Sequence, residues 1–343
     1  MKKVAILYDS PPTGKPLTLA LRRHTGLDIA EFGMWFPARR TTFYRYFIQT
    51  PLMALFPLTM LWRLRRFDTV LCWQQNFGLM LGILLRLLRW SVPAEVHVLT
   101  FIATRRRRSW PLRPIIAYAL GCRAIKTVTC YNETELELYR QTFPRVAGKF
   151  RVAQLVEETP FADTAVTADE GYFLAAGREN RDYDFLSSYF AQRPAERLVI
   201  VCDAFAAVAA PNVEVRTATY GRDYVDLVAK CHAVVFAFSD PAISSGQLVF
   251  LLALQLGKPV IATRSGCLRG YLKAGLTGLE IDKDFAALDG AIAALKDQET
   301  YARMSRAQIA DRADRFTIDS FAKRIIAITS LAGPLAATDV AEP

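Results

Sequence analysis

The chain has 343 residues, about twice the length of an average domain, with 52% hydrophobic and 22% charged residues. This composition excludes a single small module and a mostly disordered chain. The net charge of +10 is uneven, because residues 1–150 hold 23 Lys and Arg against 8 Asp and Glu, whereas residues 151–343 hold 20 against 25. We therefore expect an anionic partner to meet the first half.

The cysteines and the apolar runs indicate in which cellular compartment the protein is expected. The six cysteines are scattered, without a CxxC pair or a Cys/His cluster, which favours reduced thiols in the cytoplasm and predicts no metal site. The apolar run 4–7 is stopped by Asp9 and is too short for a signal peptide. The longest apolar stretch, 51–62, contains two prolines and falls short of the ~20 residues that a membrane-spanning helix needs. We expect a cytoplasmic protein that can lie on a bilayer but not cross it.

Short apolar runs alternate with helical segments along the chain, which is typical of parallel α/β sheets. In the first half we expect strands over 4–8, 69–73, 95–101 and 125–130, and helices over 17–24, 77–90 and 133–143. A short strand over 150–155 leads into polar sequence that we interpret as an interdomain link. In the second half we expect strands over 171–176, 197–202, 213–216, 233–238 and 259–263, and helices over 182–190, 220–230, 247–256 and 285–296.

The segment 238–247 is a candidate phosphate-binding loop between a buried strand and a helix that is apolar on every side. Such a helix belongs in a core, which fixes its N-terminus at the sheet edge where doubly wound folds receive ligands. Ser244 or Ser245 can cap the helix, Gly246 permits close backbone approach and Gln247 adds an uncharged donor. The free amides and the helix dipole suit a diphosphate. A plain helix cap with a permissive glycine is an equal alternative on this segment alone.

A second loop follows the strand 171–176, where Arg178 and Arg181 emerge shortly before a helix begins. Arg178 can bind a phosphate through both arms of its guanidinium. Arg181 either does the same or pairs locally with Asp182 or Asp184. Two phosphate-binding loops on one sheet favour a nucleoside diphosphate as ligand.

The residues of these loops resemble a known family. The helix start at Ser244–Gln247, the run Leu256-Gly257-Lys258-Pro259-Val260-Ile261 and the later Gly275-Leu276-Thr277-Gly278-Leu279 resemble the donor-binding signature of GT-B glycosyltransferases. The resemblance implies an α/β fold of two Rossmann-like domains that face each other across a cleft. It implies an acceptor-binding domain over 1–155, a nucleotide-sugar domain over 156–318 and a helix over 319–332 that crosses back, and the charge of the first domain predicts that it faces a membrane. The small, polar tail 333–343 is expected to be disordered.

The sequence departs from that family at two positions. Retaining members usually carry two glutamates eight residues apart, of which the first touches the sugar and the second grips the ribose. The matching residues here are Ser244 and Leu252. Retention and inversion of the sugar's configuration therefore both stay open.

An inverting transfer needs a general base near the acceptor hydroxyl, and Asp9 is the candidate. It follows the first strand and leads into a loop with Gly14 and Lys15, which we expect to approach the donor phosphates. In the alternative interpretation Asp9 caps a turn before the following prolines. The nucleotide-sugar is a substrate in this scheme, and no cofactor is expected.

The basic run Arg105, Arg106, Arg107 and Arg108 with Trp110 predicts a membrane or acceptor face. Arginine with tryptophan suits the headgroup level of an anionic bilayer, where each basic residue adds about 1 kcal/mol of attraction. The alternative is a solvated basic face over core helices. We expect a peripheral membrane glycosyltransferase with a lipid-linked or growing glycan acceptor. A nucleic-acid-binding protein is a second hypothesis, disfavoured because the basic run lacks a nucleic-acid motif, and an inactive GT-B-like protein is a third.

Overall fold

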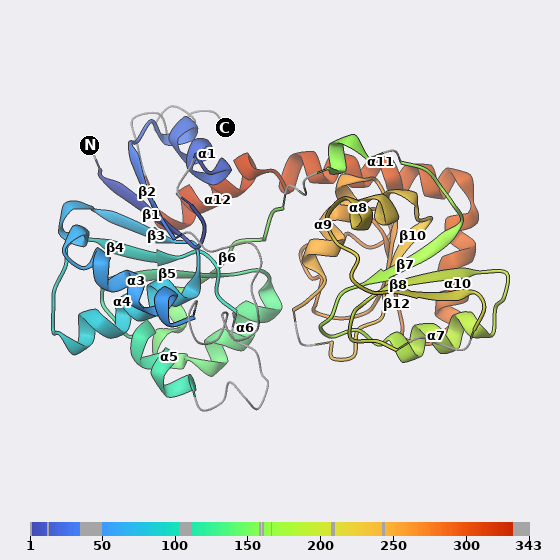
Figure 1. The fold of residues 1–343 in the computed structure, drawn as a ribbon, viewed down its shortest axis with the longest axis horizontal. Helices are drawn as coiled ribbons and strands as arrows, with labels where there is room; N and C mark the ends of the chain where they lie inside the picture. The colour runs from blue at the N-terminus through green and yellow to red at the C-terminus, as the bar shows by residue number, and fades with distance from the viewer. Residues whose placement is uncertain are drawn as a thin grey trace. The chain divides into compact units, whose positions relative to one another are not determined.

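A computed structural model of the chain describes residues 2–11, 14–34, 50–102, 112–157, 159, 161–165, 167–206, 210–241 and 244–331. These residues form two compact units (Figure 1). The first unit comprises Met1–Ala153 with Ile318–Pro343, and the second comprises Gln154–Thr317. The predicted tail over 333–343 lies outside the described residues.

The first unit is built on a parallel sheet with strand order β2-β1-β3-β4-β5-β6. Its strands are β1 (Val4–Tyr8), β2 (Ile29–Gly33), β3 (Thr69–Cys72), β4 (Glu95–Val98), β5 (Ile125–Cys130) and β6 (Phe150–Val152). Its helices are α1 (Pro16–Thr25), α3 (Thr50–Met60), α4 (Gln75–Leu87), α5 (Arg113–Leu120), α6 (Glu133–Thr142) and α12 (Ile318–Thr329), with short 3-10 helices η2 (Arg63–Arg66) and η4 (Pro144–Lys149).

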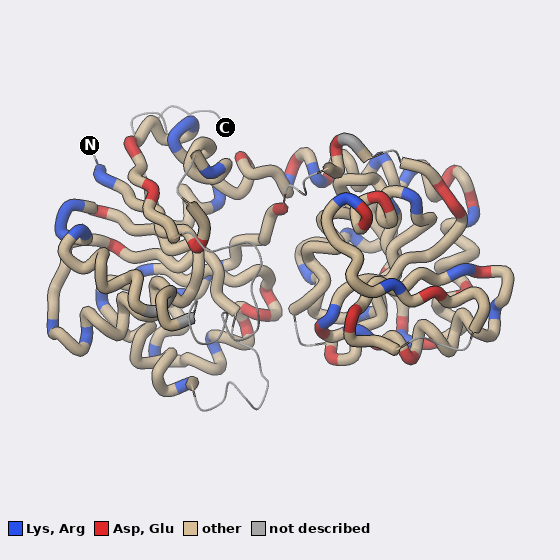
Figure 2. The backbone as a smooth tube through the Cα atoms, viewed as in Figure 1, with Lys and Arg blue, Asp and Glu red and all other residues tan. Residues whose placement is uncertain are grey.

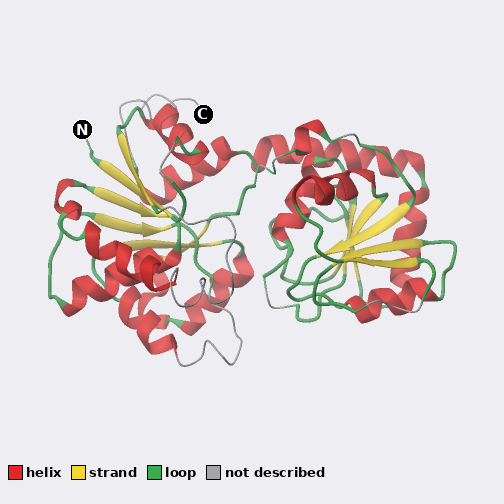
Figure 3. Ribbon diagram, viewed as in Figure 1, coloured by secondary structure: helices red, strands yellow, loops and turns green. Residues whose placement is uncertain are grey.

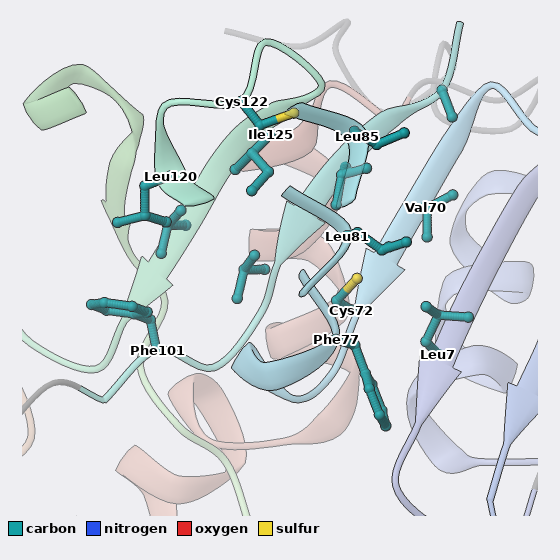
Figure 4. Close-up of a cluster of buried hydrophobic side chains, with 14 of the residues drawn as sticks. Leu7, Val70, Cys72, Phe77, Leu81, Leu85, Phe101, Leu120, Cys122 and Ile125 are labelled. Carbon is teal, nitrogen blue, oxygen red and sulfur yellow. The ribbon is translucent and has the colours of Figure 1, made fainter. Parts of the chain in front are cut away.

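The core of the first unit forms where α4 packs on the sheet (Figure 4). Phe77, Leu81 and Leu85 recur at every fourth residue of α4, so they share one helix face, and all three are buried. They pack in one cluster with Val70 and Cys72 of β3. Burying side chains of this size stabilises the fold by about 1.5–3 kcal/mol each, which fixes α4 and the loop before it.

Helix α12 joins the first unit although it comes from the C-terminal part of the chain. It packs against α1, where Arg23 and His24 each lie 2.9 Å from the carboxylate of Asp319. Phe321 is buried, and its ring lies 6.2 Å from that of Trp73. The first unit therefore consists of two distant segments of the chain.

The second unit holds another parallel sheet, with strand order β12-β11-β10-β7-β8-β9. Its strands are β7 (Tyr172–Ala176), β8 (Arg197–Val201), β9 (Val213–Arg216), β10 (Ala233–Phe236), β11 (Val260–Thr263) and β12 (Leu279–Ile281). Its helices are α7 (Tyr183–Ala191), α8 (Gly221–Lys230), α9 (Gln247–Gln255), α10 (Phe285–Lys296) and α11 (Gln298–Arg315), with the 3-10 helix η5 (Ala162–Thr164). Figure 3 shows strands flanked by helices in each unit. The predicted α/β class with two parallel sheets is confirmed.

Each sheet has one point at which the strand order reverses direction. The chain enters the first sheet at β1, places β2 on one side and β3 on the other, and it enters the second at β7 with β8 and β10 on opposite sides. The loops after the two strands at such a switch point lie at the carboxyl edge of the sheet, where doubly wound folds bind ligands. The switch points are therefore where a functional site is expected.

Candidate functional site

The loops after β7 and β10 meet at the switch point of the second sheet. The amide of Asp182 donates to the Ala237 carbonyl at 2.8 Å. The side-chain amide of Asn180 donates to the Asp240 carbonyl at 2.8 Å, and the Asp240 amide donates back to the Asn180 side chain at 2.7 Å. These bonds hold the two loops side by side, so residues of both act at one place.

Arg181 occupies the space between these loops. Its Nε donates to the Ala176 carbonyl at 2.9 Å, and one terminal nitrogen donates to the Glu179 carbonyl at 3.0 Å and to the Ser245 hydroxyl at 2.9 Å. The guanidinium also lies over the rings of Phe236 and Phe238, 5.1 and 5.3 Å from their centroids. Burial lowers the pKa of Arg181 below its ordinary value, although a guanidinium stays charged at any physiological pH. The result is a fixed, partly buried positive charge.

No carboxylate among the described residues pairs with Arg181. The predicted local alternative for this arginine is wrong, because Asp182 caps α7 through the Phe185 amide and pairs with Lys283. It is Arg178 that pairs with a carboxylate, that of Asp203, while it also donates to the Tyr220 hydroxyl at 2.9 Å. An unneutralised cation attracts an anion more strongly than a paired one, so Arg181 is the better suited of the two to an anionic ligand.

The start of α9 differs from the sequence prediction. Neither Ser244 nor Ser245 caps the helix: the cap residue is Gly246, which has a φ of +94° and no side chain to accept a hydrogen bond from the helix amides. The Ser245 hydroxyl instead accepts from Arg181, and the Ser244 hydroxyl accepts from the Gln247 side-chain amide. That amide also donates to the Cys267 carbonyl at 2.9 Å, so Gln247 holds the loop rather than offering its N–H groups to a ligand.

What α9 does offer is its own backbone. The first amides of a helix have no carbonyl one turn earlier to bind, and they carry the positive end of the helix dipole. The Ser245 hydroxyl places Arg181 next to this helix end. A helix N-terminus and a fixed guanidinium together form an anion-binding arrangement at the switch point.

Two glycines make room for the arginine. Gly177 has a φ of +120°, and a Cβ there would lie 2.9 Å from a terminal nitrogen of Arg181. A Cβ on Gly246 would lie 3.3 Å from the same nitrogen and 3.3 Å from the Phe236 ring. Both positions combine a backbone conformation that favours glycine with a close side-chain neighbour. Gly246 was predicted to let the backbone approach a ligand closely; its close neighbour in the structure is Arg181, and the ligand contact stays a prediction.

A pocket of about 240 Å³ opens beside this arrangement. It is lined by the ends of β7 and β8 and the starts of α8 and α9, namely Ala176, Gly177, Arg178, Val201, Cys202, Asp203, Thr219, Tyr220, Gly221, Tyr224 and Val249. Hydrogen bonds from the Tyr220 hydroxyl, the Ala218 amide and Arg178 lower the pKa of Asp203 to about 2. Asp203 is therefore an ionised hydrogen-bond acceptor at neutral pH.

Tyr224 also lines the pocket, with an unsatisfied hydroxyl. This oxygen is buried and has no hydrogen-bond partner among the described residues, and burial raises the pKa of the phenol. A buried polar atom without a partner costs about 1–3 kcal/mol, which a ligand group can recover. Leu252, by contrast, is packed in the core and presents no polar group to a ribose. Asp203, Tyr220 and Tyr224 were missed by sequence reasoning, although an acidic residue just after the second strand of a Rossmann-like unit is a recognisable signal.

The switch point of the first sheet has a different character. The carboxylate of Asp9, one residue beyond β1, accepts a hydrogen bond of 2.9 Å from the Gln74 side chain at the start of α4. The amides of Gly14 and Lys15 donate to the two carboxylate oxygens of Glu31 at 3.0 Å each. These amides are engaged within the first unit, so any contact of Gly14 and Lys15 with a donor would need the Lys15 side chain. Their donor-binding role stays a prediction.

The predicted membrane or acceptor face, Arg105, Arg106, Arg107, Arg108 and Trp110, lies outside the described residues. A similar combination of arginine and tryptophan is present among the described residues of the first unit. Trp62 is 72% exposed, and the centroid of its ring lies 5.4 Å from that of Trp90. The Arg65 guanidinium lies over both rings. No helix in the described ranges is long and apolar enough to cross a membrane. The described residues also contain no group of three His, Cys, Asp or Glu side chains that could hold a metal ion.

The fold has clear counterparts among solved structures. No protein-family model and no curated protein matches the sequence. HepE from Anabaena in complex with UDP-glucose matches with a TM-score of 0.64 at 15% identity, over 96% of this chain and 100% of that one. Sucrose-phosphate synthase from Thermosynechococcus elongatus matches with a TM-score of 0.67 at 13% identity, over 96% and 99% of the two chains.

A third counterpart is the lipopolysaccharide outer core galactosyltransferase WaaB, with a TM-score of 0.58 at 12% identity over 96% of this chain and 99% of that one. Similarity at this level of identity concerns the path of the backbone over nearly the whole length of each chain. Together with the two parallel Rossmann-like sheets, it shows that the chain has the GT-B fold of glycosyltransferases, as its motifs predicted.

Proposed function

We propose that the protein is a glycosyltransferase that takes its sugar from a nucleoside diphosphate sugar. The observation that carries the proposal is Arg181, a fixed cation without a carboxylate partner among the described residues, bonded to Ser245 at the start of α9. The diphosphate would bind between this guanidinium and the free amides of α9. As the sugar leaves, negative charge grows on the diphosphate, and both groups would stabilise it without having to move.

The nucleoside would occupy the 240 Å³ pocket next to Arg181. The exposed ring of Tyr220 offers a face for a base to stack on, and the Asp203 carboxylate can accept hydrogen bonds from ribose hydroxyls. Tyr224 would donate its unpartnered hydroxyl to the same ligand. In this assignment Asp203 binds the ribose, which is the role of the glutamate that many GT-B glycosyltransferases carry at the position of Leu252. Because HepE was solved with UDP-glucose, a uridine nucleotide is the first donor to test.

For the transfer itself we infer that Asp9 acts as general base. The acceptor oxygen would bond to the anomeric carbon while the bond from that carbon to the diphosphate breaks, and Asp9 would take the hydroxyl proton. The hydrogen bond from Gln74 orients the carboxylate. In this scheme the acceptor attacks the face of the anomeric carbon opposite the diphosphate, so the configuration at that carbon is inverted.

The acceptor is proposed to be a lipid-linked or growing glycan at the cytoplasmic face of a membrane. Support comes from the charge of the first half, from the basic run Arg105–Arg108 and from the exposed Trp62 beside Arg65. Tryptophan and arginine together suit the headgroup region of an anionic bilayer. The protein would then attach peripherally and receive its soluble donor from the cytoplasm.

Calorimetric titration with UDP tests the donor site. Arg181→Met should weaken UDP binding by about 30-fold or more, because truncating one partner of a buried charged contact costs 2–5 kcal/mol. Arg181→Lys keeps the charge and should retain part of the affinity. Arg306→Met, which removes an exposed arginine of α11, is the matched control and should bind as the wild type does.

The melting temperature of each variant shows whether it is folded, since Arg181 also bonds to the Ala176 and Glu179 carbonyls. UDP affinity of a folded Arg181→Met protein within twofold of wild type would remove Arg181 from the site. Transfer or hydrolysis of labelled UDP-glucose separates an enzyme from an inactive GT-B protein, a second candidate that the burial of Leu252 favours. Binding of UDP without any turnover, across a range of acceptors, would support that second candidate.

A further inference from the structure

A second, larger pocket lies at the opposite edge of the first sheet from Asp9. Its lining surrounds the starts of β5 and β6, and its volume is about 1050 Å³. The walls come from the end of α4, from α5 and the turn after it, and from η4, with the residues Arg86, Pro114, Ala117, Tyr118, Gly121, Arg123, Ile125, Lys126, Thr142, Phe143, Pro144, Arg145, Val146 and Lys149. Ligands of doubly wound sheets bind at the carboxyl edge, so this pocket belongs to neither switch point.

The charge of this lining is all of one sign. Five of its residues are Arg or Lys, and none is Asp or Glu. Arg123, Lys126 and Arg145 are exposed, and they form no ion pair with any residue in the described ranges. In the second unit, by comparison, Arg193, Arg216 and Arg264 each pair with a carboxylate. Like charges gathered around one hollow repel each other, and an anion in the hollow would remove that repulsion.

The other two cations are held in place by the end of α5. Arg86 donates to the Tyr118 carbonyl at 2.6 Å and lies 4.1 Å above the Tyr118 ring. Gly121 leaves room for it, since a Cβ there would lie 2.3 Å from a terminal nitrogen of Arg86. Lys149 donates to the carbonyls of Leu120 and Cys122 at 2.7 Å each.

These contacts leave donors for a ligand. An ammonium has three N–H groups, and the two carbonyls use two of those of Lys149, so one remains. The same contacts neutralise the negative end of the α5 dipole, which would otherwise repel an anion. Capping of α5 thus explains the positions of Arg86 and Lys149, but it does not explain why Arg123, Lys126 and Arg145 line the same pocket.

A smaller pocket of about 470 Å³ continues past the same residues. It shares Arg86, Gly121, Arg123 and Lys126 with the larger one, adds Arg89 and includes one carboxylate, Glu95. The exposed side chains of Leu87 and Ile115 lie on the helices that supply these walls. The basic surface is therefore continuous and has apolar side chains on its own helices.

We propose that this basic pocket binds a ligand with two or more phosphate groups, independently of the donor site. One phosphate would use two or three of the cations, and five cations around 1050 Å³ suit several phosphate groups. Such phosphates can come from a soluble compound or from the headgroup of an anionic lipid. The chemistry recognised is the same in both cases.

Titration calorimetry with inorganic tripolyphosphate tests the pocket. The double variant Arg123→Glu/Lys126→Glu should weaken binding by about tenfold or more, because it replaces two attractive charges with two repulsive ones. Arg306→Glu/Lys323→Glu makes the same change of net charge at exposed positions of α11 and α12, and it should stay within about twofold of wild type. Arg123→Lys/Lys126→Arg keeps both charges and should bind like the wild type.

Equal losses in the pocket and control variants would mean diffuse attraction and would overturn the proposal, as would unchanged binding by the pocket variant. Melting curves confirm that each variant folds. Arg181→Met should leave the tripolyphosphate affinity of this pocket intact, so failure here and failure of the proposed donor site are distinguishable.

Sedimentation with phosphatidylcholine vesicles that contain about 20% cardiolipin, whose headgroup carries two phosphates, identifies the source. Loss of vesicle binding in the pocket variant, with tripolyphosphate displacing the wild type, assigns the pocket to a lipid headgroup. Loss of tripolyphosphate binding alone assigns it to a soluble compound. Wild-type tripolyphosphate binding by the pocket variant would overturn the proposal whatever the vesicles show.

Discussion

In each unit the charge at the switch point of the sheet has the opposite sign to the net charge of that half of the sequence. The first half of the sequence is strongly basic, yet the switch point of its sheet carries the carboxylates of Asp9 and Glu31. The second half has an excess of acidic residues, yet its switch point carries the guanidinium of Arg181, which pairs with no carboxylate in the described part of the chain and bonds to Ser245 before α9. Figure 2 shows Lys and Arg mixed with Asp and Glu over the second unit.

The contrast between the two units distinguishes two effects of charge in one molecule. Net charge acts over distances of about a Debye length and draws a partner toward a surface. A single desolvated charge decides what binds at a site, because its interactions are not weakened by water. The basic half is thus suited to a large anionic surface, whereas our proposal places the donor phosphates on the acidic half because of one residue, Arg181.

The largest effect should come from removing the carboxylate of the first switch point. Asp9→Asn keeps an acceptor for Gln74 but cannot take a proton, so the turnover of UDP-glucose should fall by about 100-fold or more. UDP affinity, measured by calorimetry, should not change, because the donor is assigned to the second unit. Asp28→Asn, an exposed carboxylate of the same unit, is the control. Full turnover by the Asp9→Asn variant would show that Asp9 is not the general base and that the first unit does not supply this catalytic group.

Mild acid should weaken the first unit before the second. Burial, with smaller contributions from Lys2 and Lys126, lowers the pKa of His97 to about 4, and its ring nitrogens have no hydrogen-bond partner in the described part of the chain. Between this value and the unfolded pKa of about 6.5, the unfolded state binds more protons, so stability falls as the pH falls. The loss should reach about 2 kcal/mol at pH 5.

In the second unit Asp203 and Asp289 have pKa values near 2, lowered chiefly by hydrogen bonds from Tyr220 and Arg193 respectively. Their stabilising contribution is present above the ordinary carboxylate range and is lost only as the pH falls through about 2. Urea unfolding at pH 7 and pH 5, followed by hydrogen exchange for each unit, measures the contrast. His97→Leu should abolish the pH dependence of the first unit in this range, and an unchanged dependence would assign it to another group.

The smallest effect should come from the Tyr224 hydroxyl in the pocket proposed for the nucleoside, an oxygen without a hydrogen-bond partner among the residues that the structure describes. Tyr224→Phe should weaken UDP binding by about fivefold, the equivalent of one hydrogen bond of ~1 kcal/mol. The melting temperature without ligand should stay the same or rise, because the variant no longer buries an unsatisfied oxygen. Unchanged or tighter UDP binding would show that Tyr224 does not contact the nucleotide.

Much of the fold was predictable because buried strands and helices leave clear patterns. The apolar run of α9 is an example, since a helix that is apolar on every side belongs in a core. The segment α11 was not predicted, because its buried residues include Gln308 and Asp311 and it lacks an apolar stripe. Strand β2 was missed for a related reason: it is a short edge strand that contains Glu31 and is only partly buried.

The residues of the candidate site could be singled out from the sequence, but their contacts could not. The serines before Gly246 were expected to cap α9, whereas Gly246 itself is the cap residue. The Ser245 hydroxyl is instead bonded to Arg181, which lies 64 residues earlier in the chain. The roles of Arg178 and Arg181 were likewise assigned from neighbours in sequence, whereas Asp203, the actual partner of Arg178, comes from the next strand along. Local sequence shows which groups are available, and only the fold shows which of them meet.

The double origin of the first unit affects how the protein is made. Phe321 is buried against Trp73, and Asp319 pairs with Arg23 and His24. The N-terminal part of the chain therefore completes its packing only after α12 has been synthesised. During synthesis the second unit can therefore complete its sheet while the first is still without a covering helix. A ribosome that stalls before Ile318 would release a chain whose N-terminal half is exposed to proteases, and the unit that emerges first is the one that matures last.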